Sequence, residues 1–376
     1  MRILLIRLRL IGDVVFTTPA IAALRRQFPE AHLAYLVEPA AAPVVRQNRD
    51  IDELIVAERP RGLRRLTYDL QLARRLHAAR FDLVIDFHGG PRSAWLARAT
   101  RAPRRIGYNV PGRSWMYTTR VPWTRSLLPA RHSVDNQWDL LRPLGIAGPD
   151  PRRDPVRMDL DPNADASVAA RLRPARVTPR SSVVVIHVSA GNPFRRWPAD
   201  RFAEVAASLA REDAERRIMI TSGPSDRAAA EAIAADAQRR AGTASARIVR
   251  CGEFDLAELR ALFERASLFI GGDSGPLHIA ATTRLPIVAL FGPTLPERSM
   301  PWRDPAIPAV AVDAGCLACR PCHQRHCVPG DFRCLTSITV EQVIDAAHRA
   351  LAAGPENVRD RTSVNHRERT YVNEPP

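Results

Sequence analysis

Short apolar runs alternate with longer helical patterns along almost the whole chain, and this alternation restricts the fold more than any other feature of the sequence. Between the first runs, the stretches Val14–Gln27 and Leu63–Ala79 are predicted to be helices. Strands that alternate with helices form parallel sheets with helices on both faces, so an α/β fold is expected. Four buried strands are predicted here: Ile3–Leu8, His32–Val37, Ile51–Val56 and Phe81–Phe87.

The chain contains two series of this kind. A helix at about His132–Leu144 closes the first, and the Pro-rich stretch 146–180 is predicted to be a linker. We expect domains over residues 1–165 and 180–352, facing a cleft at the carboxyl ends of their strands, and a disordered polar tail over 355–376. The strands predicted for the second series are Val183–Val188, Arg217–Thr221, Ala246–Val249, Leu268–Ile270 and Pro286–Phe291.

The charge of the chain favours anionic partners. The formal net charge is +15, and all 55 basic residues are arginine, because the sequence contains no lysine. Arginine must therefore hold any anion that the protein binds. The arginines are spread along the chain and no nucleic-acid-binding motif accompanies them, so we expect an anionic lipid or phosphorylated substrate and no nucleic acid.

The N-terminal segment resembles a signal peptide only superficially. Arg7, Arg9 and Asp13 interrupt its apolar run, so no signal-peptide core can form. No stretch approaches the ~20 apolar residues that a transmembrane helix needs. A cytoplasmic location is expected, with at most peripheral contact with a membrane.

The first candidate site residue is Asp13. It lies where the first predicted strand turns into a helix, directly after Gly12. A carboxylate there would point into the cleft as a general base for an acceptor hydroxyl. The alternative from spacing alone is an Asp that caps the helix. The loop lacks the three spaced glycines of a dinucleotide-binding fingerprint.

The second candidate is the motif Gly-Gly-Asp-Ser-Gly-Pro-Leu-His, which begins at Gly271 and follows a predicted strand. The amides of Ser274 and Gly275 would face outward at a helix N-terminus, which is a phosphate-binding arrangement. Asp273 is expected to orient a ribose or an amide, and His278 to donate to a phosphate. The alternative is a capped helix with a satisfied histidine.

The third candidate follows the predicted strand that ends at Val188. Ser189 and the pair Arg195 and Arg196 occupy this loop, and arginine can hold a diphosphate through two parallel hydrogen bonds. Asp226, in a neighbouring loop, is a weaker candidate for a ribose contact.

Two further segments leave alternatives open. Five of the six cysteines lie between Cys316 and Cys334, which fits either a structural zinc site or a thiol-rich loop. The segment from Arg59 to Arg80 has seven arginines against one acid. It is predicted to lie on acidic lipid, to receive an anionic acceptor, or to be a core-facing helix with a solvated basic face.

Taken together, these motifs resemble glycosyltransferase family 9, the heptosyltransferases of lipopolysaccharide assembly, over roughly residues 1–351. The resemblance rests on the run Ile-Gly-Asp-Val-Val-Phe-Thr-Thr-Pro from Ile11 and on Gly272-Asp-Ser-Gly-Pro-Leu-His. It also rests on Phe81-Asp-Leu-Val-Ile-Asp-Phe-His-Gly, Arg104-Arg-Ile-Gly-Tyr, Arg196-Trp-Pro and Phe291-Gly-Pro-Thr.

The resemblance implies a GT-B fold, with the acceptor on the N-terminal domain and the nucleotide sugar on the C-terminal one. It implies metal-independent, inverting transfer of a heptose from ADP-heptose to the lipopolysaccharide inner core at the cytoplasmic face of the inner membrane. Rival expectations are another nucleotide-sugar donor, a non-catalytic nucleotide-sugar or lipid-surface binding protein, and an epimerase.

The resemblance also assigns roles to residues. Asp13 matches the family's proposed base, and Arg195 stands where members often have lysine. A cysteine pattern seen in many members is matched by Cys319, Cys322, Cys327 and Cys334. The donor-binding positions it implies are Asp226, Asp273, Ser274, Gly275, His278 and Thr294.

Overall fold

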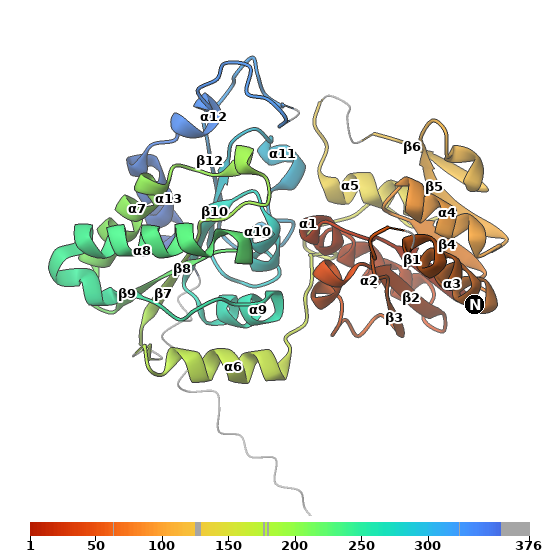
Figure 1. The fold of residues 1–376 in the computed structure, drawn as a ribbon, viewed down its shortest axis with the longest axis horizontal. Helices are drawn as coiled ribbons and strands as arrows, with labels where there is room; N and C mark the ends of the chain where they lie inside the picture. Colours follow the sequence, from red (N-terminus) through yellow and green to blue (C-terminus); the bar gives the residue numbers. More distant parts are fainter. Residues whose placement is uncertain (63, 125–128, 176, 179, 323, 355–376) are drawn as a thin grey trace, which may run out of the picture.

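Two six-stranded sheets with parallel pairing throughout form two bodies that lie side by side (Figure 1). The computed structural model describes residues 1–354 except 63, 125–128, 176, 179 and 323. The expected disordered tail over 355–376 therefore lies outside the described residues. The α/β expectation is confirmed, because the strands alternate with helices along both halves.

The first sheet has the order β3-β2-β1-β4-β5-β6. Its order reverses between β2 and β4, so the chain leaves β1 at the switch point where ligands of doubly wound sheets bind. The strands are β1 (Arg2–Ile6), β2 (His32–Val37), β3 (Glu53–Val56), β4 (Leu83–Asp86), β5 (Arg104–Asn109) and β6 (Thr119–Pro122).

Helices cover both faces of this sheet because successive side chains of a strand point to opposite sides. Leu4 and Ile6 pack against one layer of helices, whereas Ile3 and Leu5 pack against the other. The first layer contains α3 (Arg64–Ala78) and α4 (Pro91–Ala99), and the second contains α1 (Ile11–Val15), α2 (Thr18–Gln27) and α5 (Ser133–Trp138). Short 3₁₀ helices occupy Pro39–Val44, Ser114–Met116 and Asp139–Leu144.

The second sheet has the order β12-β11-β10-β7-β8-β9. Its strands are β7 (Ser182–His187), β8 (Arg216–Thr221), β9 (Ile248–Val249), β10 (Leu268–Gly272), β11 (Ile287–Phe291) and β12 (Ala309–Asp313). One face is covered by α7 (Ala199–Glu212), α8 (Arg227–Ala241) and α13 (Val340–Ala352), and the other by α9 (Leu256–Arg265) and α10 (Gly275–Ala280). The remaining short helices are α11 (Pro296–Ser299) and α12 (Arg333–Thr336).

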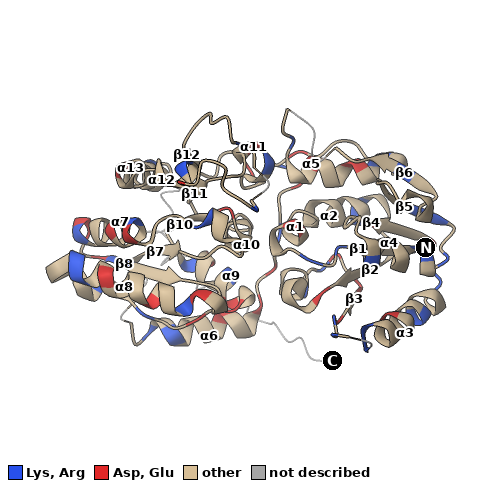
Figure 2. Cartoon of the chain, turned by 45° about the horizontal axis from the view of Figure 1, so that its top comes forward, with Lys and Arg blue, Asp and Glu red and all other residues tan. Residues whose placement is uncertain are grey.

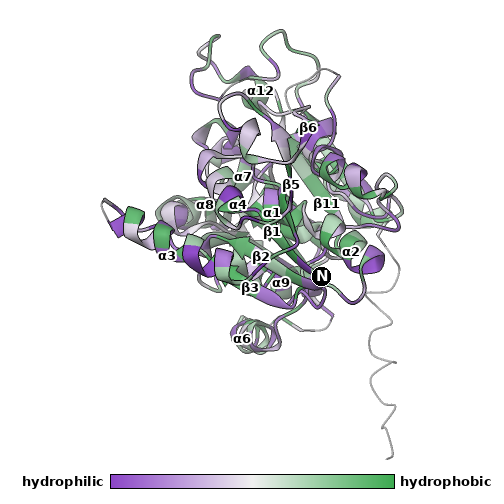
Figure 3. Ribbon diagram, turned by 90° about the vertical axis from the view of Figure 1, so that its right-hand side faces the viewer, coloured by the Kyte–Doolittle hydropathy of each residue, from purple (hydrophilic) through white to green (hydrophobic). Residues whose placement is uncertain are grey.

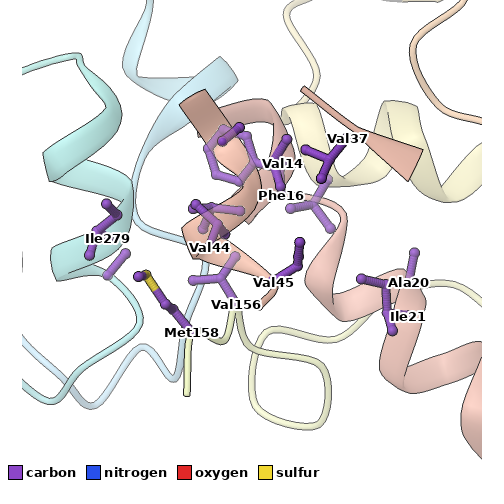
Figure 4. Close-up of a cluster of buried hydrophobic side chains, with 14 of the residues drawn as sticks. Val14, Phe16, Ala20, Ile21, Val37, Val44, Val45, Val156, Met158 and Ile279 are labelled. Atoms are coloured by element: carbon purple, nitrogen blue, oxygen red, sulfur yellow. The ribbon is translucent and has the colours of Figure 1, made fainter. Parts of the chain in front are cut away.

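One apolar core runs from the first domain into the second. Val14 and Phe16 of the first domain share it with Ile279 on α10. Val156 and Met158, on the segment that joins the domains, fill the space between them (Figure 4). The cleft-side helices of the two domains are therefore packed together, and this packing fixes how their functional loops face each other.

Several local expectations differ from the structure. The helix predicted over Val14–Gln27 is two helices, and the first begins at Ile11. The break coincides with Thr17 and Thr18, whose hydroxyls donate to carbonyls three residues earlier. Leu10 occupies the N-cap position of α1, so the helix-cap alternative for Asp13 is wrong.

The stretch 146–180, predicted to be a linker, contains the helix α6 (Pro162–Leu172). Asp161 caps this helix, and Pro162 is at its start, so the prolines of this stretch begin a helix as well as interrupting one. Ion pairs Arg171–Glu258 and Arg265–Asp165 join α6 to α9, beneath the second sheet in Figure 1. The domain limits 1–165 and 180–352 stay a prediction.

Candidate functional site

Asp13 is buried in the first turn of α1, beyond the carboxyl end of β1. Its carboxylate forms a short ion pair with the equally buried Arg7. Arg7 is itself held by a 2.6 Å hydrogen bond to the carbonyl of Phe87. Gln137 on α5 donates to the backbone carbonyl of Asp13 over 3.2 Å. Arg7 thus orients the carboxylate and Gln137 holds the backbone of the same residue, as a positioned base requires.

A small pocket opens on this carboxylate within the first domain. Arg7 and Asp13 form its charged wall, and the rest is aromatic or polar and neutral. Its volume of about 20 Å³ admits a water-sized group, such as a hydroxyl, and not a whole sugar ring. The other lining residues are Phe87, Tyr108, Trp123, Ser133, Asn136 and Gln137.

The second domain places a carboxylate at the matching edge of its sheet. Asp273 follows β10 and accepts a hydrogen bond from Thr294 at 2.7 Å. Arg195 lies 3.1 Å and His278 lies 3.4 Å from its oxygens. Burial alone would raise the pKa of Asp273, but the hydrogen bond from His278 and the charge of Arg195 outweigh it and lower the pKa to about 2. Asp273 is therefore a fixed anion that organises two donors around itself.

Two polar atoms in this loop have no partner within the described part of the chain. They are Oγ of Ser274, the N-cap residue of α10, and Nδ1 of His278. Because buried polar atoms are normally hydrogen-bonded, orphaned ones at a functional site point to an absent ligand. Ser274 and His278 lie at the start of α10, where backbone amides are also free to bind oxygens.

The remaining predicted donor residues form a second group. Arg196 pairs with Asp226 at 3.0 Å, which joins the loops after β7 and β8. Ser189 accepts a hydrogen bond from the amide of Gly223 and strengthens the same junction. Trp197 is buried and packs edge-on against Phe202. Ser189 and Asp226 are thus engaged with protein groups, while Arg195, Asp273, His278 and Thr294 form one connected network.

The two domains meet where these groups lie. A β-carbon on Gly12 would lie 2.3 Å from Cδ2 of His278, and one on Gly275 would lie 3.0 Å from Ile11. The first turns of α1 and α10 are therefore in direct contact (Figure 1). Asp13, one residue after Gly12, is held beside the loop that carries Ser274 and His278.

Comparison with known proteins identifies the family. A family model described as glycosyltransferase family 9 (heptosyltransferase) matches residues 70–328, which is more than half of the chain. The chain belongs to glycosyltransferase family 9. The expected family resemblance is confirmed, and with it the enzyme class of glycosyltransferase.

Relatives of this family 9 enzyme include lipopolysaccharide heptosyltransferase 3 of Escherichia coli K12, which is 29% identical over 90% of this chain and 95% of that protein. Lipooligosaccharide heptosyltransferase 2 of Haemophilus ducreyi is 24% identical over 94% and 100%. A family 9 glycosyltransferase structure from Veillonella parvula superposes with a TM-score of 0.79 at 25% identity, covering 93% of this chain and 97% of that one.

Heptosyltransferase II of E. coli has a TM-score of 0.71 at 18% identity over 94% and 99% of the two chains. The expected GT-B fold is thus confirmed.

Sequence reasoning missed three residues that contact the candidate site: Arg7, Gln137 and Gln324. For Arg7 a signal existed, because it interrupts an apolar run six residues before Asp13. Gln137 and Gln324 had none, since their contacts are long-range.

Gln324 joins the cysteine-rich segment to the donor loop. Its Oε1 accepts a 2.7 Å hydrogen bond from Nε of Arg195 and a 3.1 Å bond from Asn192. Arg320 donates to the carbonyl of Thr294, so the segment contacts the loops after both β7 and β11. Arg195 and Thr294, which are predicted to hold the donor, are therefore supported from outside the two predicted donor motifs.

Cys319, Cys322, Cys327 and Cys334 line one cavity of about 700 Å³ in this segment. Burial is the main cause of the raised pKa of the Cys334 thiol, and the neighbouring thiols raise it further. Within the described residues, which omit residue 323, no three His, Cys, Asp or Glu side chains are close enough to hold a metal ion. All six cysteines are free thiols. The zinc site therefore stays a prediction.

Proposed function

We propose that the protein transfers a heptose from ADP-heptose to a hydroxyl of the lipopolysaccharide inner core, with inversion at the anomeric carbon. The observation that carries this proposal is the contact between Gly12 and His278, which sets Asp13 of one domain beside the anion-binding loop of the other. E. coli heptosyltransferase WaaC, a structural neighbour with a TM-score of 0.65, is described as a complex with ADP-2-deoxy-2-fluoro heptose.

The acceptor would bind at the mouth of the pocket of the first domain, with its reacting hydroxyl inside. Asp13 takes the proton of the attacking hydroxyl, and its ion pair with Arg7 holds the carboxylate toward the pocket. Arg7 and Gln137 act through Asp13, so they are positioning residues. The aromatic side chains of Tyr108 and Trp123 offer a face on which the acceptor sugar can lie.

The donor would bind across the second domain, with its diphosphate at the start of α10. As the bond from the anomeric carbon to the diphosphate breaks, negative charge grows on the leaving oxygen. Ser274 Oγ and His278 Nδ1 have no partners in the described structure. The Ser274 hydroxyl can donate to the leaving oxygen, and Nδ1 of His278 can do so when both ring nitrogens carry a proton, because Nε2 already donates to Asp273. Arg195 and Arg196 supply positive charge in a chain without lysine. These groups are the basis for proposing that the transfer needs no divalent metal.

The reaction would occur at the cytoplasmic face of the inner membrane, because the proposed acceptor is an anionic glycolipid. Within the described residues no helix is long and apolar enough to span a membrane. Contact with the membrane must then come from a surface of the folded domains.

Substitution Asp13→Asn tests the base. The amide keeps the size of the side chain but cannot accept the proton, so we expect turnover to fall at least about a thousandfold while ADP binding stays close to that of the wild type. Asp165→Asn, on α6, removes an ion pair far from the pocket and serves as the matched control. Near-normal turnover of Asp13→Asn would exclude this residue as the base.

The donor is tested separately by thermal unfolding with ADP, UDP, GDP or NAD. A ligand at 100 times its dissociation constant adds about 2.7 kcal/mol to the unfolding free energy. Stabilisation by ADP alone supports ADP-heptose, whereas stabilisation by UDP or GDP replaces the donor but keeps the mechanism. A lack of any shift would favour a protein that binds lipid surfaces without catalysis.

A further inference from the structure

Helix α3 carries an exposed apolar pair that the protein core does not use. Leu72, Ala73 and Leu76 face the first sheet and are buried. Leu66 and Leu70, in contrast, are 63% and 49% exposed. Residues four apart lie on one side of a helix, so these two leucines form a single outward patch.

Unpaired arginines surround this patch. Arg59, Arg61, Arg64 and Arg74 are exposed, and none of them forms an ion pair with a carboxylate of the described chain. The acid of the helix, Asp69, faces inward, where Arg65 and Arg92 hold it. Glu58 is the exposed acid nearby.

The helix projects from the body of the first domain, with apolar and polar residues alternating along it (Figure 3). Basic residues lie along α3, whereas acidic and basic residues are mixed on α7 and α8 (Figure 2). The exposed surface of α3 therefore combines a leucine patch with an excess of positively charged side chains.

The position of α3 relates this patch to the acceptor pocket. Arg92 binds Asp69 on α3, the carbonyl of Glu58 and the carboxylate of Glu38. The amide of Glu38 in turn bonds the carbonyl of Leu8, just before α1 and Asp13. The start of α3 thus lies at the carboxyl edge of the sheet, as Asp13 does, although α3 and α1 cover opposite faces of the sheet.

We infer that α3 is a membrane-docking element, whose leucines enter the interface of an anionic phospholipid bilayer while its arginines bind lipid phosphates. Apolar burial and attraction of basic side chains to anionic lipid act together in such interfacial helices. A glycolipid keeps its acyl chains in the bilayer while its sugar reaches Asp13, so the docking surface must border the acceptor pocket. The inference rests on the proposed function only in taking the acceptor to be membrane-bound.

Co-sedimentation of the full-length protein with lipid vesicles tests the inference. One vesicle contains phosphatidylcholine alone, and the other also contains phosphatidylglycerol. We expect binding to the anionic vesicle only, and a loss of about tenfold or more in both Leu66→Ser/Leu70→Ser and Arg64→Ala/Arg74→Ala. Leu160→Ser and Arg227→Ala/Arg239→Ala are controls with exposed residues elsewhere, and they should bind as the wild type does.

If either test variant binds the anionic vesicle as tightly as the wild type does, the inference is overturned. This includes the case in which the arginine substitutions weaken binding and the leucine substitutions do not.

A parallel assay uses a deacylated, water-soluble acceptor, on which the Leu66→Ser/Leu70→Ser protein should keep the wild-type rate. If Arg64→Ala/Arg74→Ala raises KM for that acceptor without changing vesicle binding, the face holds the acceptor's phosphates and not a bilayer. If the wild type binds vesicles but transfers to neither acceptor, the proposed function fails and the docking surface stands.

Discussion

The imidazole of His278 lies over Gly12 so closely that a methyl group on that glycine would come within 2.3 Å of the ring. His278 belongs to the second domain and Gly12 to the first, and both residues lie in the packed contact between α1 and α10. His278 also bonds Asp273, so the same ring connects the interface with the anion-binding network.

Gly12→Ala should therefore damage catalysis more than folding. The added methyl group must either turn His278 away from Asp273 or push α1 and Asp13 out of place. A displacement of about 1 Å at a reacting group can cost on the order of a hundredfold in rate, and we expect that loss in kcat/KM. Gly148→Ala is the matched control, because no atom lies within 4 Å of its added carbon. Equal kinetics for the two variants would contradict this account of the contact.

Gln324→Ala should weaken donor binding. Arg195 would lose its 2.7 Å hydrogen bond to Gln324, which costs about 1 kcal/mol, or about fivefold in the donor KM. We expect kcat to change less, because Arg195 keeps its ion pair with Asp273. Gln238→Ala removes a glutamine that bonds Ile248 and Arg250 away from the site. Steady-state kinetics with varied donor concentration measure the donor KM of both variants. Equal values would show that Gln324 has no positioning role.

Stability should fall between pH 7 and pH 5, in part because of His187. Burial lowers the pKa of His187 to about 4, so the folded protein binds a proton on this side chain at a lower pH than the unfolded chain does. The contribution of a neutral His187 is complete above the unfolded pKa of about 6.5 and is lost as the pH falls toward 4. Its loss between pH 7 and 5 is about 2 kcal/mol. Urea unfolding of His187→Gln should show a correspondingly smaller pH dependence, and an unchanged dependence would refute this assignment.

The cysteine-rich segment is the basis of a prediction about metal. Thiolates are preferred zinc ligands, so Cys319, Cys322, Cys327 and Cys334 stay the predicted ligands of a structural zinc ion. Because no three such side chains are close enough to hold a metal within the described residues, zinc binding would require these thiols to move together. Elemental analysis should find a stoichiometric amount of zinc in the wild type and in the control Cys251→Ser, and little in Cys319→Ser/Cys334→Ser. Metal-free wild-type protein would leave a thiol-rich loop as the explanation.

The strands that sequence patterns predicted well are the central ones. Ile3–Ile6 and Phe269–Ile270 are buried on both faces, so an uninterrupted apolar run marks them. Arg104–Asn109, Thr119–Pro122 and Ala309–Asp313 lie toward the edges of the sheets and carry polar or exposed residues, so no strand was predicted there. The edge strands β3 and β9 were predicted nevertheless, because short apolar runs mark them.

The candidate site residues were chosen from local motifs. Asp13, Asp273 and His278 each lie in the loop or the short helix that follows a strand, where such a motif marks them. Gln137 and Gln324 contact residues more than a hundred positions away, and nothing near them in the sequence shows this. The break between α1 and α2 was also missed, because two threonines that bond back to the helix read as ordinary helical positions.

The close approach of Gly12 and His278 has a consequence for how sequences of this family can change. The proposed base and the proposed donor loop belong to different halves of the chain, yet the space at residue 12 is limited by a ring on the other half. A side chain gained at residue 12 is tolerable only if the residue at 278 becomes smaller at the same time. Homologous sequences should therefore pair glycine with histidine at these two positions, and lose both together where transfer activity has been lost.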